Sequence, residues 1–313
     1  MPTSRQGAIR LFRFSGIDVS LHWSWFIVAV IEVNGGWGSY SSRAWNVAEY
    51  LSIFVIVTLH EFGHSLACRQ VGGRANQIVL WPLGGVAYVD PPPRPGATLW
   101  SIAAGPLVNV VLYPILGAIA QLSYSLGWAA TMPDFYKLLV AVSDINFYLL
   151  VFNILPIYPL DGGQILRSLL WFVMGRARSL MVATILGLIG IPAFIGLAIL
   201  RQSSWLGILA VFMLLNCWGG LQQARALLRF AKLPRREGYA CPACKAAPPV
   251  GNVWTCGQCG QLFDTFQNQG VCPFCGVQFP VTRCIECGAS RPISEWAMPV
   301  ISVSSTFTPS MRS

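Results

Sequence analysis

Long apolar runs fill residues 19–230 and constrain the fold more than any other feature of the sequence. Six of them approach the roughly 20 residues that an α-helix needs to cross a bilayer. The chain is 54% hydrophobic and only 11% charged, whereas soluble domains carry about 25% charged residues. We therefore predict an α-helical polytopic membrane protein with about six transmembrane helices. They lie near Val19–Val33, Ala48–Cys68, Thr98–Leu122, Leu138–Tyr158, Leu180–Leu200 and Trp205–Leu221, and the first is short and carries Glu32 near its end.

Lysine and arginine are distributed unevenly between the predicted loops, and cytoplasmic loops of membrane proteins retain positive charge. The apolar run after Arg13 has no small-residue cleavage site and is interpreted as an anchor. With the N-terminus inside, the cytoplasmic segments hold 14 basic residues: Arg5, Arg10, Arg13, Arg69, Arg74, Arg94, Arg167, Arg176, Arg178, Arg225, Arg229, Lys232, Arg235 and Arg236. The outer segments hold only Arg43, Lys137 and Arg201. This predicts a multi-pass protein of the cell membrane with both termini in the cytoplasm.

The second predicted span ends in His60-Glu61-Phe62-Gly63-His64. Positions four apart share one face of a helix, so both imidazoles can bind one zinc ion while Glu61 stands beside it as a general base. Ionisable groups at membrane depth are costly and usually functional. The alternative is a pair of interfacial histidines near a helix end.

A catalytic zinc site usually has three protein ligands and a water molecule, so a further ligand is needed. Asp161 follows the inner end of the fourth predicted span and lies at the depth of the HExxH histidines, whereas Asp144 lies near the outer end. His22 is an alternative ligand, although an interfacial or hydrogen-bonding role suits it better. Prolines and glycines around Asp161 interrupt the helix, and such backbone survives at membrane depth only when it is buried in protein or lines a wet cavity. The alternative for Asp161 is an ordinary helix-ending turn with an exposed side chain.

Three motifs on separate spans together resemble the site-2 protease family of intramembrane zinc metalloproteases. The resemblance covers roughly residues 10–230. The motifs are the HExxH of residues 60–64, the segment 153–162 that matches NxxPxxPLDG, and Ala-Gly-Pro-Leu-Val-Asn at residues 104–109.

This resemblance implies that His60, His64 and Asp161 bind zinc and that Glu61 activates a water molecule. The implied function is hydrolysis of a peptide bond in or near the transmembrane segment of a membrane-protein substrate, as in regulated intramembrane proteolysis. The alternative is a non-catalytic membrane scaffold or metal-handling protein with the same fold. The intact Glu61 favours the enzyme, because neither alternative needs a general base between two ligands.

Two polar residues inside spans, Asn109 and Asn153, are candidates for binding an extended substrate or a developing oxyanion. Alternatively, they join helices by hydrogen bonds. The β-prone runs Gln77–Trp81 and Val86–Val89 flank Pro82–Gly85 and predict a hairpin. The resembled family has a membrane-associated β element here, which either pairs with an unwound substrate strand or covers the site.

Eight of the ten cysteines lie in four CxxC pairs after Glu237. Such pairs predict tetrahedral zinc held by four thiolates, and disulfides are disfavoured in a reducing cytoplasm. Loops of 11 and 8 residues between neighbours suggest two consecutive zinc ribbons, although the middle pairs could share an ion. We thus expect one catalytic and about two structural zinc ions. The pairs are Cys241/Cys244, Cys256/Cys259, Cys272/Cys275 and Cys284/Cys287, while Cys68 and Cys217 are interpreted as apolar fillers.

The polar C-terminal part has no net charge, because residues 237–313 hold four basic and four acidic side chains. Without a basic patch we do not expect nucleic-acid binding, and a protein regulator or the substrate is the better partner. The predicted organisation is a transmembrane metalloprotease domain over 1–230, a basic linker over 231–240, a double zinc ribbon over 241–290 and a disordered tail over 291–313.

Overall fold

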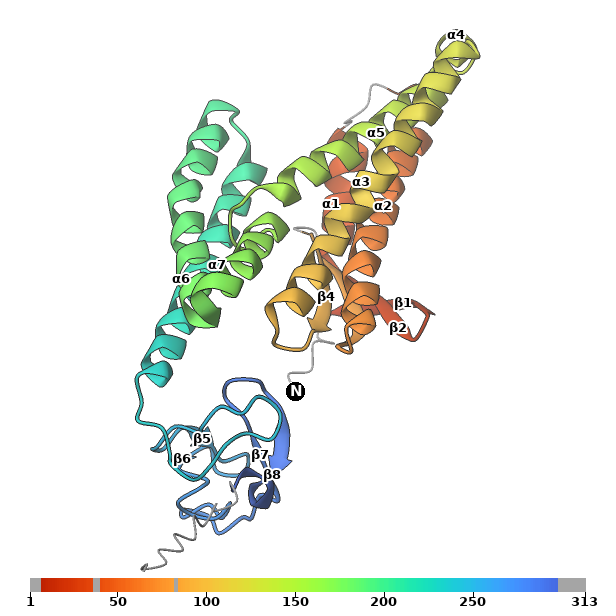
Figure 1. Cartoon of the computed structure of the whole chain (residues 1–313). Helices are drawn as coiled ribbons and strands as arrows, with labels where there is room; N and C mark the ends of the chain where they lie inside the picture. The colour runs from red at the N-terminus through yellow and green to blue at the C-terminus, as the bar shows by residue number, and fades with distance from the viewer. Residues whose placement is uncertain (1–6, 36–39, 82–83, 298–313) are drawn as a thin grey trace, which may run out of the picture. The chain divides into compact units, whose positions relative to one another are not determined.

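A computed structural model of the chain describes residues 7–35, 40–81 and 84–297 (Figure 1). The chain divides into two compact units, Met1–Leu227 and Leu228–Ser313. They are called the membrane unit and the C-terminal unit, and each is described by itself.

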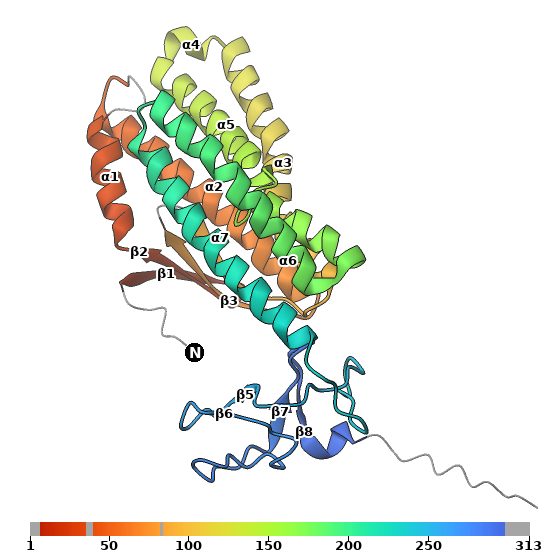
Figure 2. The ribbon, with the colours of Figure 1, turned by 90° about the vertical axis from the view of Figure 1, so that its left-hand side faces the viewer.

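Within the described part of the membrane unit, five helices are long and apolar enough to cross a membrane: α2 (Arg43–Gln70), α3 (Pro95–Ser125), α5 (Pro133–Ile154), α6 (Asp161–Leu200) and α7 (Ser204–Ala231). Figure 2 shows them running along one common direction. Their outward side chains are apolar and strongly exposed, such as Val173 at 86% and Leu200 at 82%. A surface of this kind suits lipid, and the chain is a multi-pass membrane protein. The short helix α4 (Trp128–Thr131) joins α3 to α5.

The first predicted span is wrong as a single helix. Its first residues form strand β2 (Ile17–His22), and helix α1 (Ser24–Gly35) follows. The burial of Ile17 and Val19, with half-buried Asp18 between them, follows the two-residue period of a strand. The 12 described residues of α1 span about 18 Å, short of the roughly 30 Å hydrocarbon layer.

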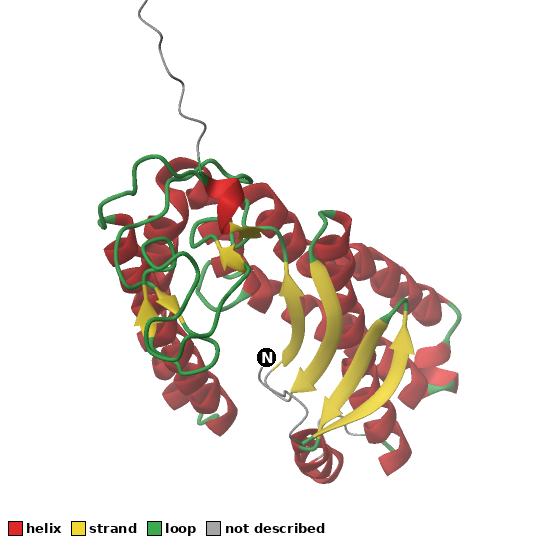
Figure 3. Ribbon diagram, turned by 90° about the horizontal axis from the view of Figure 1, so that it is seen from below, coloured by secondary structure: helices red, strands yellow, loops and turns green. Residues whose placement is uncertain are grey.

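A four-stranded sheet lies against the helices, in the order β1 (Ala8–Phe14), β2, β3 (Arg74–Trp81) and β4 (Gly84–Asp90). Figure 3 shows the four strands side by side. β3 and β4 are antiparallel, which confirms the predicted hairpin; its residues 82–83 lie outside the described residues. β1 and β2 were not expected from the sequence.

Strands β2 and β3 pair in parallel, with Leu21 opposite Leu80. Parallel neighbours need a crossover, and α1 and α2 provide it. Ile17, Val19, Ile78 and Leu80 bury their side chains with Val57 of α2 in one core. The sheet is thereby packed against the helix that carries the HExxH motif.

The connection between α5 and α6 is not helical over residues 155–160. Pro156 and Pro159 lack the N–H group that a helix interior requires. Ile157 and Tyr158 of this connection pack against Ile191 of α6 and Cys217 of α7. α6 then begins at Asp161 and is kinked at Gly175, whose φ of 80° and ψ of 170° are not helical.

The C-terminal unit is built from two small hairpins, β5 (Trp254–Thr255) with β6 (Leu262–Phe263) and β7 (Val281–Arg283) with β8 (Ser290–Pro292). A single 3-10 turn, η1 (Ile293–Trp296), follows β8. Trp296 is 1% exposed and packs on Phe266 in the core of the unit.

Residues on both sides of the expected ribbon domain, 241–290, take part in the structure of the C-terminal unit. Residues 291–297, expected in the disordered tail, belong to β8, η1 and the core around Trp296. In the expected linker, Arg236 forms an ion pair at 2.5 Å with the fully buried Asp264, and Arg235 pairs with Glu286 at 2.8 Å. Asp264 also accepts hydrogen bonds from the backbone N–H groups of Gly251, Phe266 and Gln267. The remaining tail, residues 298–313, lies outside the described residues.

Candidate metal centres

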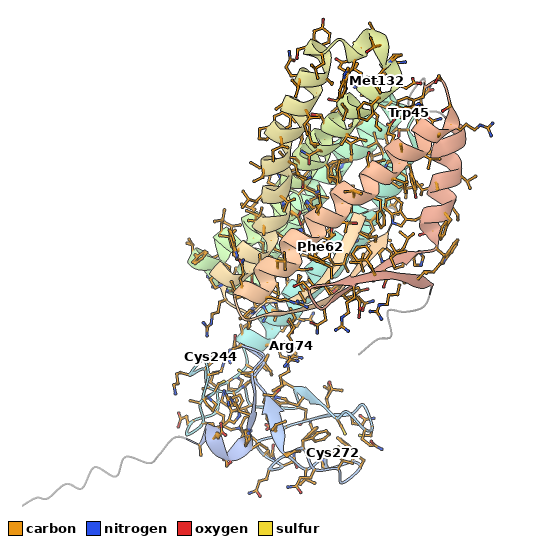
Figure 4. All side chains as sticks on the ribbon, turned by 90° about the vertical axis from the view of Figure 1, so that its right-hand side faces the viewer. Trp45, Phe62, Arg74, Met132, Cys244 and Cys272 are labelled. Carbon is orange, nitrogen blue, oxygen red and sulfur yellow. The ribbon has the colours of Figure 1, made fainter. Side chains whose placement is uncertain are left out.

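Helix α2 carries three buried polar residues of the HExxH motif. His60, Glu61 and His64 are 4%, 6% and 6% exposed. The Nε2 atoms of the two histidines are 3.1 Å apart, as expected for residues one helical turn apart. One ligand atom from each of the three residues lies within 4.8 Å of the others. Figure 4 shows their neighbour Phe62 on the same helix.

Asp161, the first residue of α6, faces the two histidines. Its Oδ2 atom lies 3.0 Å from His60 Nε2 and 3.3 Å from His64 Nε2. Tetrahedral zinc with bonds of about 2.0–2.1 Å requires neighbouring ligand atoms about 3.3 Å apart. The spacing and the chemistry of this donor set therefore fit one zinc ion. His60, Glu61, His64 and Asp161 are called the intramembrane cluster.

The other ring nitrogen of each histidine is fixed by a hydrogen bond. His64 Nδ1 lies 2.9 Å from the backbone carbonyl oxygen of Ser101, and His60 Nδ1 lies 2.5 Å from Asn109 Oδ1. Both partners are acceptors, so both Nδ1 atoms carry the proton. Each Nε2 atom then presents a lone pair, which is the tautomer that a metal ion needs.

Two glycines allow α2 and α3 to approach closely at the cluster. A Cβ atom on Gly105 would lie 2.8 Å from His60 Nε2 and closer still to the His64 ring. A Cβ atom on Gly63 would lie 2.6 Å from the Ala104 carbonyl oxygen. The space at the two Nε2 atoms therefore exists because residue 105 has no side chain.

The two asparagines predicted as substrate-binding candidates differ in their surroundings. Asn109 is fully buried, and its amide bonds to His60 and to Asn146 of α5. This matches the alternative in which it joins helices. Asn153 is half-buried in the last turn of α5, and no hydrogen bond links it to the intramembrane cluster among the described residues. Asn146 was not singled out from the sequence, although a polar amide within an apolar helix could have indicated it.

The two other ligand candidates considered in the sequence analysis, His22 and Asp144, have different surroundings. His22 Nδ1 is 2.6 Å from Ser24 Oγ, and its ring stacks on Trp81 with centroids 3.8 Å apart. Asp144 is exposed on α5.

The eight CxxC cysteines form two groups of four, but not the expected ones. One group, the outer quartet, contains the first and last pairs, and the other, the inner quartet, contains the two middle pairs. The expectation of consecutive ribbons is therefore wrong, and the open alternative of crossed pairing holds. Figure 4 labels one cysteine from each group, Cys244 and Cys272. The outer quartet is Cys241, Cys244, Cys284 and Cys287, and the inner quartet is Cys256, Cys259, Cys272 and Cys275.

The sulfur geometry of both quartets suits zinc. Sγ–Sγ distances are 3.7 and 3.8 Å in the outer quartet and 3.6 and 3.7 Å in the inner one. Four thiolates about 2.3 Å from zinc lie about 3.8 Å apart in a tetrahedron, whereas disulfide sulfurs lie about 2.0 Å apart. All eight thiols are free.

The four CxxC pairs share one backbone turn. In each, the N–H group of the first cysteine donates to a carbonyl oxygen five residues later, as from Cys256 to Gln261 at 2.8 Å. The residue after the second cysteine has positive φ in all four, and it is Gly260, Gly276, Gly288 and, in the first pair, Lys245. Such a left-handed residue is usually glycine, so the turn is readable from the sequence even though the pairing is not.

A buried HExxH pair with a carboxylate from a separate helix is a donor set of the kind that zinc metalloproteases use. Residues 48–126 and 118–197 of this chain match the model of peptidase family M50. Over these residues, just under half of its length, the chain is similar to that family. The matched range contains the whole intramembrane cluster and ends before the cysteine quartets.

Several individual proteins are similar to this chain. The chain is 35% identical over 180 residues to a zinc metalloprotease of Methanocaldococcus jannaschii, covering 58% of this chain and 50% of the relative. It is 31% identical over 118 residues to stage IV sporulation protein FB of Bacillus subtilis, covering 37% and 38%. The solved site-2 protease from M. jannaschii has a TM-score of 0.49 and 26% identity, covering 68% of this chain and 95% of that one. This chain spans about half the length of the first curated relatives it matches.

Proposed function

We propose that the chain is a zinc-dependent endopeptidase that hydrolyses a peptide bond in or near the transmembrane segment of a membrane-protein substrate, as in regulated intramembrane proteolysis. The observation that carries this proposal is the convergence of His60 Nε2, His64 Nε2 and Asp161 Oδ2 within 3.3 Å. The match to zinc metalloproteases supports the choice of metal and reaction.

Each residue of the intramembrane cluster has a role in this proposal. His60, His64 and Asp161 would hold the zinc ion, which when bound polarises the scissile carbonyl and lowers the pKa of a water molecule towards about 7. Glu61 accepts the proton of that water and passes it to the leaving amine. Asn153, at the end of α5, remains a candidate for hydrogen bonding to the substrate backbone.

Comparison of the wild type with Glu61→Gln tests the enzymatic role. We expect the variant to keep its zinc, since Glu61 is not one of the three proposed ligands. Cleavage should fall by about 10²–10⁴-fold, the usual contribution of a general base. The measurement is cleavage of a single-span model substrate in reconstituted membranes, together with zinc content. Equal cleavage by both proteins would favour a non-catalytic scaffold or metal-handling protein.

For the rest of the chain, we infer that the cysteine quartets hold two structural zinc ions and that the C-terminal unit contacts the substrate or a protein regulator. The Sγ distances in both quartets support the metal sites. The balance of four basic and four acidic residues from 237 to 313 supports a protein partner over nucleic acid. The excess of basic residues in one set of loops supports a cell-membrane location with the C-terminus in the cytoplasm. The pairing of β2 with β3, which follows the inner end of α2, supports the same side for the N-terminus.

A further inference from the structure

Two fully buried asparagines on neighbouring helices lie behind His60. Asn109 of α3 and Asn146 of α5 are both 0% exposed. Asn146 Nδ2 donates to the backbone carbonyl oxygen of Asn109 at 3.0 Å, and Asn109 Nδ2 donates to Asn146 Oδ1 at 2.8 Å. Asn109 Oδ1 accepts from His60 Nδ1 at 2.5 Å.

The direction of each hydrogen bond in this series is set by the acceptor at its far end, the backbone carbonyl oxygen of Asn109. A backbone carbonyl oxygen can only accept, so Asn146 must present Nδ2 to it and Oδ1 to the Asn109 side chain. Asn109 must then present Nδ2 to Asn146, which leaves its Oδ1 for His60. His60 Nδ1 must therefore carry the proton. His64 reaches the same state directly, through the carbonyl oxygen of Ser101.

We propose that Asn146 is a positioning residue for the intramembrane cluster: it fixes the orientation of the Asn109 amide and thereby holds His60 in the tautomer whose Nε2 can bind a metal ion. This inference rests on the proposed function of the cluster. Asn146 itself makes no hydrogen bond to His60, Glu61, His64 or Asp161 among the described residues and acts only through Asn109.

Loss of Asn146 would free the Asn109 amide to turn over. Its Nδ2 would then face His60 Nδ1, which would have to accept the hydrogen bond. The proton would move to Nε2, and a protonated Nε2 has no lone pair for zinc. Loss of partners behind a metal ligand typically lowers metal affinity by about 10–100-fold.

The test uses the full-length chain in lipid nanodiscs with the substitution Asn146→Leu, which keeps the number and branching of the side-chain heavy atoms but removes both hydrogen-bonding groups. We expect zinc affinity at the intramembrane cluster, measured by chelator competition, to fall by about 10–100-fold. The chain has only three histidines, so the ¹⁵N spectrum of the metal-free protein resolves their tautomers. The Nδ1 nitrogen of His60, protonated in the wild type, should lose its proton wholly or in part in the variant. The matched control is Asn216→Leu, which removes a half-buried asparagine of α7 whose side chain, among the described residues, donates only to the Phe212 carbonyl oxygen of its own helix.

A second variant separates this role from simple packing. Asn109→Asp has an oxygen atom in both positions, so it accepts from His60 Nδ1 whichever way it turns. The double variant Asn109→Asp/Asn146→Leu should therefore recover the Nδ1–H tautomer and most of the zinc affinity. Unchanged affinity and tautomer in Asn146→Leu would overturn the proposal, as would a double variant no better than the single one. Neither readout depends on proteolysis, so a failure of the proposed enzymatic activity would be seen separately in the Glu61→Gln comparison.

Discussion

At the scale of single residues, the intramembrane cluster depends on two glycines, which have no side chain, as much as on its ligands. Gly105 leaves open the space beside both Nε2 atoms, and Gly63 lets α3 approach α2 at Ala104. The HExxH spacing and the position of Asp161 were readable from the sequence because helical periodicity and chain direction are local properties. The partners of the Nδ1 atoms were not, because they come from α3 and, through Asn109, from α5.

Substitution of Gly105 tests this account. Gly105→Ala places a methyl group within 2.8 Å of His60 Nε2, so we expect the cluster to lose its zinc while both cysteine quartets keep theirs. The measurement is zinc per chain by elemental analysis, with a decrease of one ion relative to wild type. Gly117→Ala in the same helix, where a Cβ atom meets nothing within 4 Å, should retain the full amount. Full zinc content in Gly105→Ala would contradict the proposed site.

At the scale of elements, the connection between α5 and α6 sets the position of Asp161. Residues 155–160 leave the helical path, and Tyr158 is held by α6 and α7, where Cys217 Sγ donates to its carbonyl oxygen at 2.9 Å. The prolines of this connection made the break predictable. Packing of the connection on Gly187 and Gly220 could not be predicted, because those glycines lie more than 20 residues away in the sequence.

We expect Gly187→Val to disturb the cluster from a distance. A Cβ atom at this position would lie 2.6 Å from Cys217 Sγ and 2.8 Å from the Tyr158 carbonyl oxygen. Overpacking of this kind costs about 1–3 kcal/mol, and displacement of Tyr158 would move Asp161. Thermal stability and zinc affinity should both fall. Gly196→Val on the same helix meets nothing within 4 Å, so it carries the same change in helix propensity without the clash. Equal effects of the two variants would show that packing on Tyr158 is unimportant.

At the scale of the whole molecule, the chain combines a membrane unit that matches the M50 peptidase model over residues 48–197 with a C-terminal unit outside the matched range. In the C-terminal unit the inner quartet lies, along the sequence, between the two halves of the outer quartet. Metal binding at the outer quartet closes a loop of the chain that contains the inner quartet, and so restricts the segment that carries it.

Cysteine substitutions distinguish this nested pairing from consecutive ribbons. Cys241→Ser and Cys256→Ser should each remove one zinc ion, and the double variant should remove two, because the residues belong to different quartets. In consecutive ribbons they would share an ion, and the double variant would lose only one. Cys241→Ser/Cys284→Ser is the matched control and should lose one ion, since both residues belong to the outer quartet. Zinc per chain by elemental analysis measures all four proteins.

The sequence alone determined the features that depend on local spacing and composition: the five long apolar helices, the hairpin of β3 and β4, the HExxH turn and the four CxxC turns. The tertiary structure decided the features that depend on which distant segments meet. These are the parallel pairing of β2 with β3 in place of a first span, the nesting of the cysteine quartets and the buried asparagine pair behind His60. The periodicity of a helix or the geometry of a turn is set by neighbouring residues. The pairing of distant segments is selected by the packing of the whole fold, and short-range sequence patterns do not predict it.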